Sequence, residues 1–322
     1  MIHVTDGGMS TTVQDLGRQG YYHIGMPPSG AMDRTSHQIA NALVGNDPDA
    51  ATLEMTYKGA SLEFEEDAII ALAGASMGAT VNDDSIPMYE AVRIEAGQEL
   101  TLEFTTEGAR TYLAVAGGID VEPVMESRST YTLVGIGGYN GRTLESGDAL
   151  AVGEPSSDPE AAIGNVAPVE YRPDIAEKTE IRIVIGLCDY RLTDDSRAAL
   201  CDVEWKVTPE ANRVGYRLEG PELEFVEREQ PFGAGTDPSN VTDIGYPVGS
   251  IQVPQKPIVL MQDAVTGGGY ATVGTVISTD RNVLSQRRTH ETITFDAVTI
   301  EEALEARAAA KTDLEAIRSY LE

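Results

Sequence analysis

Residues 68–94, "AIIALAGASMGATVNDDSIPMYEAVRI", are the stretch that decides the fold class. The apolar run at 68–74 has the composition of a buried β-strand, residues 82–85 favour a turn, and a second extended run follows at 91–94. Short β-rich runs separated by turn residues recur throughout the chain, at the spacing typical of barrels and sandwiches. We therefore predict a mainly β fold.

The same stretch contains Gly74, Ser76 and Gly78 in a GxSxG pattern, which in hydrolases marks a nucleophilic serine. Such a serine needs a helix directly after the turn, because the helix N-terminus helps to build the oxyanion hole. Here an extended run follows, and His290 is the one histidine in the order that such a triad requires. A small-residue turn at Ser76 is therefore favoured over a nucleophile.

The predicted strands share β-branched or aromatic residues and flanking turn signals. They lie at residues 61–64, 68–74, 91–94, 100–104, 111–117, 148–152, 181–186, 204–208, 216–220, 257–262, 272–278 and 292–295.

Two segments have the period of an amphipathic helix. In residues 33–45, Asp33 is the candidate N-cap, Ile39 and Leu43 lie on one face with Val44, and Gly45 ends the helix.

The second helix is predicted over residues 299–322, where Thr299 and Glu302 have the spacing of a capping box. Its apolar residues form a stripe that we expect to dock onto the protein. They are Leu304, Leu314, Ile317 and Leu321.

A weak internal repeat and the length of 322 residues both indicate two domains. Residues 57–64 are similar to 218–225, and residues 111–118 are similar to 269–276, at offsets near half the chain. We place the boundary in a segment rich in Pro, Ser and acidic residues, which has the composition of a linker. The predicted parts are domains at 1–155 and 175–322, joined by a linker at 153–174.

The charge balance is strongly acidic, with 52 Asp and Glu against 23 Lys and Arg and a net charge of −29. This composition favours a halophilic protein, and it argues against binding to nucleic acids or anionic membranes.

We expect the melting temperature to rise between dilute and molar KCl, because salt screens the repulsion among the carboxylates. Thermal unfolding followed across a KCl series measures this. A flat or falling melting temperature would contradict the halophilic assignment.

Several classes of site and segment are not indicated by the sequence. Cys188 and Cys201 match no zinc or redox motif, no phosphate-binding loop or biotinylated lysine motif occurs, and we expect no metal and no cofactor in this chain. The sequence also has neither a transmembrane run nor the pattern of a signal peptide, so we expect a soluble, cytoplasmic protein.

The candidate binding residues are polar side chains within glycine-rich turns, where a rigid scaffold would present them to a ligand. They are Gln14, Asp15, Arg18, Ser29, Asp33, Arg110, Arg128, Ser129, Arg213, Tyr216, Arg217, Gln252, Thr266 and Tyr270.

Arginine can hold a carboxylate through two parallel hydrogen bonds, so a carboxylate or amide ligand is indicated. The alternative is an Arg–Asp pair that pins one turn to another, and for Asp15 with Arg18 the two interpretations stay open. For Arg128 and Arg217 ligand binding is favoured. No nucleophile is assigned.

The segments "TVQDLGRQGYYHIGMPPSGAMD", "GARTYLAVAGGIDV", "NRVGYRLEGP", "GSIQVP" and "TGGGY", in this order, resemble the family of the 5-oxoprolinase C subunit. This family is also called the biotin-dependent carboxyltransferase or allophanate hydrolase subunit 2 family, and it includes the carboxyltransferase part of urea carboxylase. The resemblance implies two cyclophilin-like β-barrels with a few short helices.

The resemblance also implies a function. Together with a separate A subunit, and with a B subunit that is homologous to it, the chain would convert 5-oxo-L-proline to L-glutamate with ATP hydrolysis, and it would be inactive alone. Arg128 and Arg217 would then hold the substrate carboxylate, while Gln14, Gln252 and Tyr270 would orient the amide.

Two alternatives stay open within the family. One is carboxyl transfer to urea or a related amide from biotin on a separate carrier. The other is a regulatory protein that antagonises a kinase inhibitor similar to the B subunit.

Overall fold

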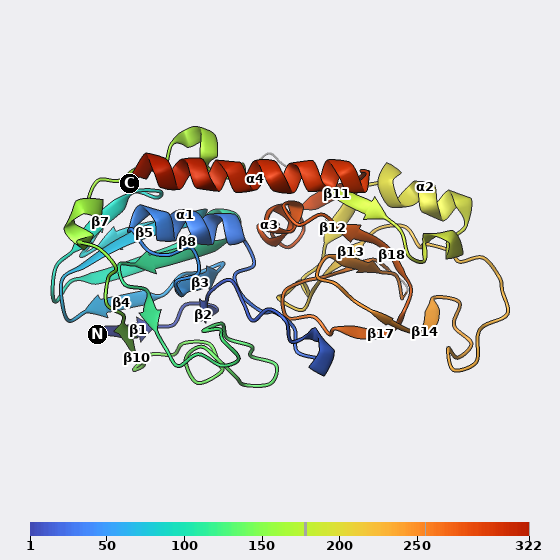
Figure 1. Cartoon of the computed structure of the whole chain (residues 1–322), viewed down its shortest axis with the longest axis horizontal. Coiled ribbons are helices and arrows are strands. Elements are labelled where there is room, and N and C mark those ends of the chain that lie inside the picture. The colour runs from blue at the N-terminus through green and yellow to red at the C-terminus, as the bar shows by residue number, and fades with distance from the viewer. Residues whose placement is uncertain (177–178, 255, 322) are drawn as a thin grey trace. The chain divides into compact units, whose positions relative to one another are not determined.

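The structure is a computed structural model that describes residues 1–176, 179–254 and 256–321. The chain divides into two compact units (Figure 1). Unit 1 consists of Met1–Arg18, Ser29–Ala176 and Lys311–Glu322, and unit 2 of Gln19–Pro28 and Glu177–Ala310. Residues 153–174 lie in unit 1.

Unit 1 is built on a 10-stranded sheet in which β2, β3, β8, β4, β1, β10 and β9 are neighbours in that order, and β5 joins β6, β7 and β8. The strands are β1 (Ile2–Asp6), β2 (Thr11–Gln14), β3 (Thr52–Thr56), β4 (Ser61–Phe64), β5 (Ala68–Val81), β6 (Asp84–Ser85), β7 (Ala91–Ile94), β8 (Glu99–Val115), β9 (Ile119–Asp120) and β10 (Ala149–Val152).

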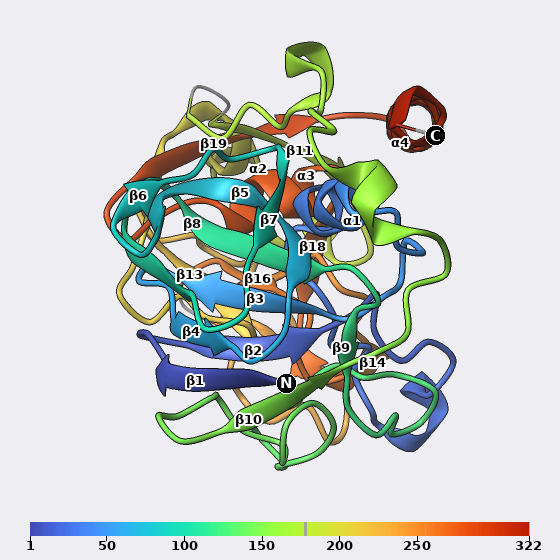
Figure 2. The ribbon, with the colours of Figure 1, turned by 90° about the vertical axis from the view of Figure 1, so that its left-hand side faces the viewer.

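The two faces of this sheet carry separate apolar clusters. Leu53, Leu62 and Leu72 belong to the larger cluster. Ile69 and Tyr112 belong to the second, together with buried residues of helix α1 (Arg34–Leu43). This helix packs against strands β5 and β8 (Figure 2). Because side chains alternate across a strand, one strand supplies both clusters.

Ser76 lies inside strand β5, so the prediction of a turn at this position is wrong. Strand β5 runs without a break from Ala68 to Val81, and its pairing with β8 shifts register on both sides of Ser76. Gly74 has a φ of 107°, which only glycine adopts easily, and this lets the strand bulge and continue. The small residues therefore mark bulges in a long strand rather than its end.

The predicted helix at 33–45 is confirmed. The Asp33 carboxylate accepts hydrogen bonds from the backbone N–H groups of Thr35 and Ser36, which a helix start leaves without partners. Ile39 and Leu43 are fully buried, and Gly45 follows the helix with a φ of 74°.

His37 in helix α1 is fully buried between the Thr52 hydroxyl, at 2.9 Å, and the Pro48 carbonyl, at 3.1 Å. Burial lowers the pKa of His37 from 6.5 to about 4, against the smaller opposing effects of Asp15 and Glu54. Between pH 6.5 and about 4, His37 is therefore protonated in the unfolded chain but neutral in the folded chain.

We expect wild-type stability to fall as pH decreases from 6.5 to about 4, with His37 contributing up to about 3 kcal/mol of the loss. Denaturant unfolding at several pH values measures this, and His37→Gln should show a shallower slope than the wild type. His23→Gln, at an exposed position, should keep the wild-type slope. Equal slopes for wild type and His37→Gln would contradict the assignment.

Unit 2 contains a closed barrel in the order β11, β18, β15, β16, β13, β12 and β19, and a separate two-stranded ribbon of β14 and β17. These strands are β11 (Glu180–Ile185), β12 (Trp205–Val207), β13 (Gly215–Glu219), β14 (Asn240–Gly245), β15 (Ser250–Gln252), β16 (Ile258–Leu260), β17 (Gly267–Tyr270), β18 (Thr272–Val276) and β19 (Thr292–Ala297).

Two helices of unit 2 were not expected from the sequence, α2 (Asp194–Asp202) and α3 (Asp280–Ser285). Helix α2 does carry a start signal, because the Thr193 hydroxyl accepts from the Ser196 N–H and acidic residues fill the first turn. Short 3-10 helices occur at Tyr22–Ile24, Pro159–Ala162, Val169–Tyr171 and Asp189–Arg191.

The C-terminal helix α4 (Ile300–Leu321) starts with the predicted capping box. The Glu302 N–H donates to the Thr299 hydroxyl at 3.2 Å, and the Thr299 N–H donates to the Glu302 carboxylate at 2.8 Å. The expected docking stripe is only partly right, because Leu304 is 48% exposed. Leu314, Ile317 and Leu321 do pack in unit 1, in the cluster that holds α1.

The predicted mainly β fold with barrel-like sheets and a C-terminal helix is confirmed. The sequence repeat has a weaker counterpart in the structure, because 61–64 form strand β4 whereas 222–225 lie outside the named strands. In the described part of the chain, no helix combines the length and the apolar character that crossing a membrane requires.

Candidate functional site

In unit 1 the candidate residues converge on Asp15, which follows strand β2. Its carboxylate accepts hydrogen bonds from the Gly17 N–H and the Ser127 hydroxyl, both at 2.7 Å, and from the Ser129 hydroxyl and the Arg128 N–H. Asp15 is 7% exposed, so these bonds are shielded from water. The carboxylate thereby holds the loop at 127–129 in place.

Arg18 reaches the same loop from the other end of the turn. Its guanidinium donates to the Ser129 carbonyl and, at 3.5 Å, to the Val124 carbonyl, and the side chain is 1% exposed. Asp15 and Arg18 therefore both form hydrogen bonds to the segment 124–129, and both have a structural role in this site.

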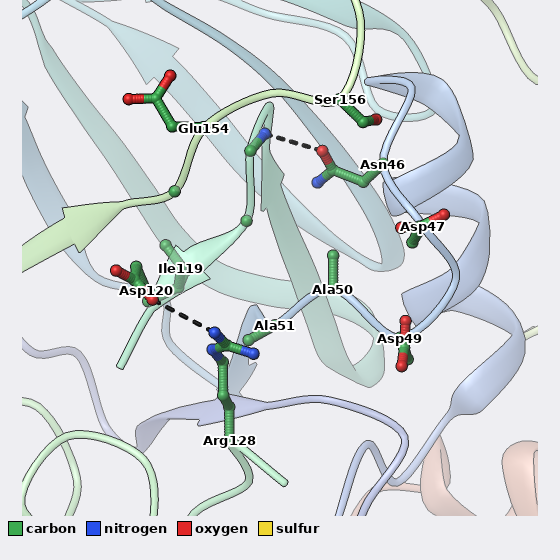
Figure 3. A pocket seen from close by; sticks show the side chains of 13 residues that line it. Asn46, Asp47, Asp49, Ala50, Ala51, Ile119, Asp120, Arg128, Glu154 and Ser156 are labelled. Atoms are coloured by element: carbon green, nitrogen blue, oxygen red, sulfur yellow. Dashed lines mark hydrogen bonds and ion pairs between the residues drawn. The ribbon is translucent and has the colours of Figure 1, made fainter. Parts of the chain in front are cut away.

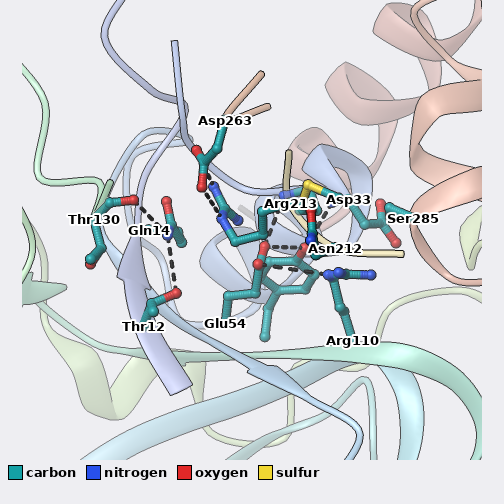
Figure 4. Close-up of polar contacts among 12 residues, drawn as sticks. Thr12, Gln14, Asp33, Glu54, Arg110, Thr130, Asn212, Arg213, Asp263 and Ser285 are labelled. Atoms are coloured by element: carbon teal, nitrogen blue, oxygen red, sulfur yellow. Dashed lines mark hydrogen bonds and ion pairs between the residues drawn. The ribbon is translucent and has the colours of Figure 1, made fainter. Parts of the chain in front are cut away.

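Gln14 and Ser29 are fully buried and each has a polar atom without a hydrogen-bond partner in the described structure. The Gln14 amide donates to the Thr12 hydroxyl at 3.0 Å and the Thr130 carbonyl at 3.2 Å, which leaves its oxygen unpaired (Figure 4). Ser29 has a φ of 52°, which is unfavourable for a serine. Unpaired buried groups and strained backbone are features that ligand sites tolerate.

A buried ion pair lies next to this region and was not predicted. The Glu54 carboxylate is 3.8 Å from the Arg110 guanidinium, and it accepts from the Tyr112 hydroxyl at 2.7 Å and the Met32 N–H at 2.8 Å (Figure 4). The Tyr112 hydroxyl also accepts from the Asp33 N–H at 2.7 Å. Glu54 thus connects strands β3 and β8 to the turn before α1.

Burial, reinforced by the Glu54 and Asp33 carboxylates, raises the pKa of Tyr112 well above its ordinary value. The phenol therefore stays protonated and keeps donating to Glu54. Asp33 is engaged as the cap of α1, so Asp33 and Arg110 serve the scaffold in this structure.

Arg128 lines a surface pocket of about 390 Å³ in unit 1 (Figure 3). The guanidinium lies 3.4 Å from the Asp120 carboxylate, and Asp47, Asp49 and Glu154 line the same pocket. Four carboxylates around one guanidinium disfavour a further anion there. The geometry therefore gives Arg128 little support as the anion ligand.

Arg213 in unit 2 forms a two-pronged ion pair with Asp263. Its Nε donates to Oδ2 at 2.7 Å and its Nη2 to Oδ1 at 3.2 Å, and both side chains are largely buried. Tyr216 is buried as well, and its hydroxyl donates to the Ser285 carbonyl at 2.9 Å. Both residues hold the barrel together.

Arg217, Thr266 and Tyr270 are the more accessible candidates of unit 2. Arg217 is exposed on β13, where its guanidinium donates to the Glu210 carbonyl at 3.4 Å and also helps to lower the pKa of the Glu210 carboxyl. Tyr270 is 44% exposed at the end of β17, and Thr266 is partly exposed just before that strand.

Gln252 ends strand β15 and is 5% exposed, with its side-chain nitrogen unpaired in the described structure. Thr272 is its register partner on β18, and the buried Thr272 hydroxyl is also unpaired. The sequence did not point to Thr272.

The structure thus brings Gln14, Asp15, Arg18 and Ser129 together in unit 1 and places Arg213, Tyr216, Arg217, Gln252, Thr266 and Tyr270 in unit 2. Sequence reasoning missed Glu54, Asp263, Ser127 and Thr272. For Glu54 a signal existed, because a glutamate lies between apolar residues in "TLEMT". In the described residues no cluster of His, Cys, Asp and Glu is placed to hold a metal ion.

Comparison with known proteins identifies the family. Residues 24–297 match the family described as carboxyltransferase domain, subdomain A and B. The chain is 38% identical over 309 residues to the C subunit of 5-oxoprolinase from Escherichia coli strain K12, and the match covers 95% of this chain and 94% of that protein.

Larger proteins contain a similar part. Urea amidolyase of Lachancea kluyveri is 33% identical over 325 residues, which are 98% of this chain but 18% of that protein. The crystal structure of the K. lactis urea amidolyase has a TM-score of 0.92 at 30% identity and covers 98% of this chain and 20% of that one. Sequence and fold agree, so the chain belongs to the carboxyltransferase domain family, subdomains A and B.

Proposed function

We propose that this chain is a subunit of an ATP-dependent 5-oxoprolinase that converts 5-oxo-L-proline to L-glutamate. The observation that carries the proposal is the extent of the match, which covers 94% of the C subunit of E. coli 5-oxoprolinase. The urea amidolyase is matched over only 18% of its length. The relative that is similar almost from end to end is therefore the oxoprolinase subunit.

The reaction opens an unstrained lactam, so the amide must be activated and its developing charge stabilised. Arg217 is the better of the two proposed ligands for the substrate carboxylate, because its guanidinium is exposed and forms no ion pair in the described part of the chain. Arg128 is the weaker one because Asp120 lies beside it. Gln14, Gln252 and Tyr270 are proposed to orient the amide.

The proposed complex also contains a separate A subunit, together with a B subunit that is homologous to this chain, and it acts in the cytoplasm. ATP is consumed by the complex, and we propose no cofactor for this chain itself. The name of the E. coli relative, a subunit, supports the need for partners.

A second candidate is carboxyl transfer to urea or a related amide, with biotin on a separate carrier. It is favoured by the TM-score of 0.92 to the K. lactis urea amidolyase.

We expect the purified chain to be inactive alone, and to support ATP-dependent glutamate release from 5-oxoproline once its cognate A and B subunits are added in high KCl. Glutamate release measured with and without each component tests this. Omitting the chain should abolish release, because each subunit is proposed to be essential, and excess avidin should change nothing.

Two outcomes would decide against the proposal. Release that persists without this chain would show that it is not a subunit of the enzyme. Activity lost on adding avidin would favour biotin-dependent carboxyl transfer instead.

A further inference from the structure

Two buried polar atoms on neighbouring strands of the unit 2 barrel have no hydrogen-bond partner in the described structure. Gln252 on β15 and Thr272 on β18 are register partners at a point where the pairing of the two strands shifts register, so the two residues lie close together beside a bulge. Gln252 is 5% exposed and Thr272 is fully buried. The Gln252 Nε2 and the Thr272 Oγ1 are both without a hydrogen-bond partner in the described structure.

This face of the barrel lies beside the cluster of Tyr246. Gln252 is also the register partner of Ile258 on β16, and Ile258 packs against the cluster of Tyr246, Leu260 and Ala264. Gln252 and Ile258 therefore share a face.

Strands β14 and β17 pair as a two-stranded ribbon (Figure 1). The Tyr246 side chain is hydrogen-bonded to the backbone at the end of this ribbon. The Tyr246 hydroxyl accepts from the Tyr270 N–H at 2.6 Å and donates to the Tyr270 carbonyl at 3.1 Å. The Tyr246 ring lies so close to Gly268 that a Cβ there would be 3.0 Å from a ring carbon. The ribbon thus ends at Tyr270, two residues before Thr272.

Leaving these atoms unpaired costs free energy. A buried polar group without a partner destabilises a fold by about 1–3 kcal/mol, and apolar side chains of similar shape would avoid that cost. Two such groups side by side are the arrangement expected of a site that a ligand completes.

We infer that Gln252 and Thr272 form a subsite for a planar amide group that presents N–H and C=O on one edge, as a lactam or a urea does. A carboxamide offers one donor and one acceptor, so it can pair with such an edge through two parallel hydrogen bonds. The Thr272 hydroxyl supplies a third. This inference rests on the proposed function, since it concerns the amide of that substrate.

The probe is 2-pyrrolidinone, a lactam without the carboxylate of 5-oxoproline, and the measurement is its affinity for the full chain by ligand-observed NMR in high KCl. The wild type should bind it. Gln252→Glu removes the N–H donor and Thr272→Val the hydroxyl, and each should weaken binding about tenfold, the effect of one lost hydrogen bond. N-methyl-2-pyrrolidinone, which lacks the N–H, should bind about tenfold more weakly than the probe.

Thr275→Val is the matched control, because Thr275 lies on the same strand and pairs with Ser250 instead. It should bind like the wild type. Thr272→Val should also raise the melting temperature, since it removes an unpaired buried hydroxyl, and this shows that weaker binding is not unfolding.

The inference is overturned if the wild type does not bind 2-pyrrolidinone, or if Gln252→Glu and Thr272→Val bind it as the wild type does. The reconstitution with the A and B subunits is a separate measurement. If the complex releases glutamate but the Gln252 and Thr272 variants bind the lactam like the wild type, the proposed function stands and only this subsite is ruled out.

Discussion

Glu54→Ala is expected to destabilise the protein by about 3–5 kcal/mol, the largest effect of any single change considered for this chain. The substitution removes the carboxylate that lies 3.8 Å from the Arg110 guanidinium, whose side chain is 4% exposed. It also removes the acceptor for the Tyr112 hydroxyl and the Met32 N–H. Denaturant unfolding compared with the wild type measures the loss.

Two further variants separate the charge from the packing. Glu63→Ala, at an exposed position on β4 of the same sheet, should change stability by less than about 0.5 kcal/mol. The double variant Glu54→Leu with Arg110→Met removes both charges, so it should be more stable than Glu54→Ala. If the single variant Glu54→Ala is as stable as the wild type, the Glu54–Arg110 ion pair does not make the expected contribution to the free energy of unfolding.

Asp15→Ala is expected to cost about 3 kcal/mol and to loosen the loop that it holds. Its carboxylate accepts four hydrogen bonds, and one hydrogen bond to a charged acceptor contributes about 1.5–3 kcal/mol. Contributions within one network do not add, so the expected loss is well below the sum of the four. Three of the four come from the loop at 127–129. Hydrogen exchange of residues 124–130 should therefore become faster, together with a lower unfolding midpoint.

Asp120→Ala is the matched control, because Asp120 is another carboxylate next to Arg128, but it is 55% exposed and meets Arg128 at 3.4 Å. Exposed ion pairs contribute at most about 1 kcal/mol, so this variant should leave exchange in the loop unchanged. Unchanged exchange in Asp15→Ala would mean that the loop is held by other contacts.

The helix starts were accessible from the sequence because a cap is a local interaction. Asp33 lies one residue before α1 and Thr299 three residues before Glu302, so both could be identified from neighbours along the chain. Helix α2 was missed although Thr193 caps it in the same way, because its apolar residues are too few to show a helical period.

The candidate site, too, was accessible from the sequence only in its local features. Glycine-rich turns pointed correctly to the polar residues around Asp15 and Arg18, but not to what they do, because their partners at 124–129 lie more than 100 residues away. The GxSxG pattern misled for a related reason. Whether small residues turn a chain or bulge a strand depends on the partner strand, here β8.

The sequence by itself determined the mainly β class, both capped helices, the acidic surface and the family, since these depend on composition, spacing and short-range contacts. Only the tertiary structure decided which polar groups are buried, which of them find partners and which do not. The Glu54–Arg110 pair and the unpaired groups of Gln252 and Thr272 arise where strands distant in sequence come into register. Pairing between distant strands sets burial and hydrogen bonding, and no local pattern records it.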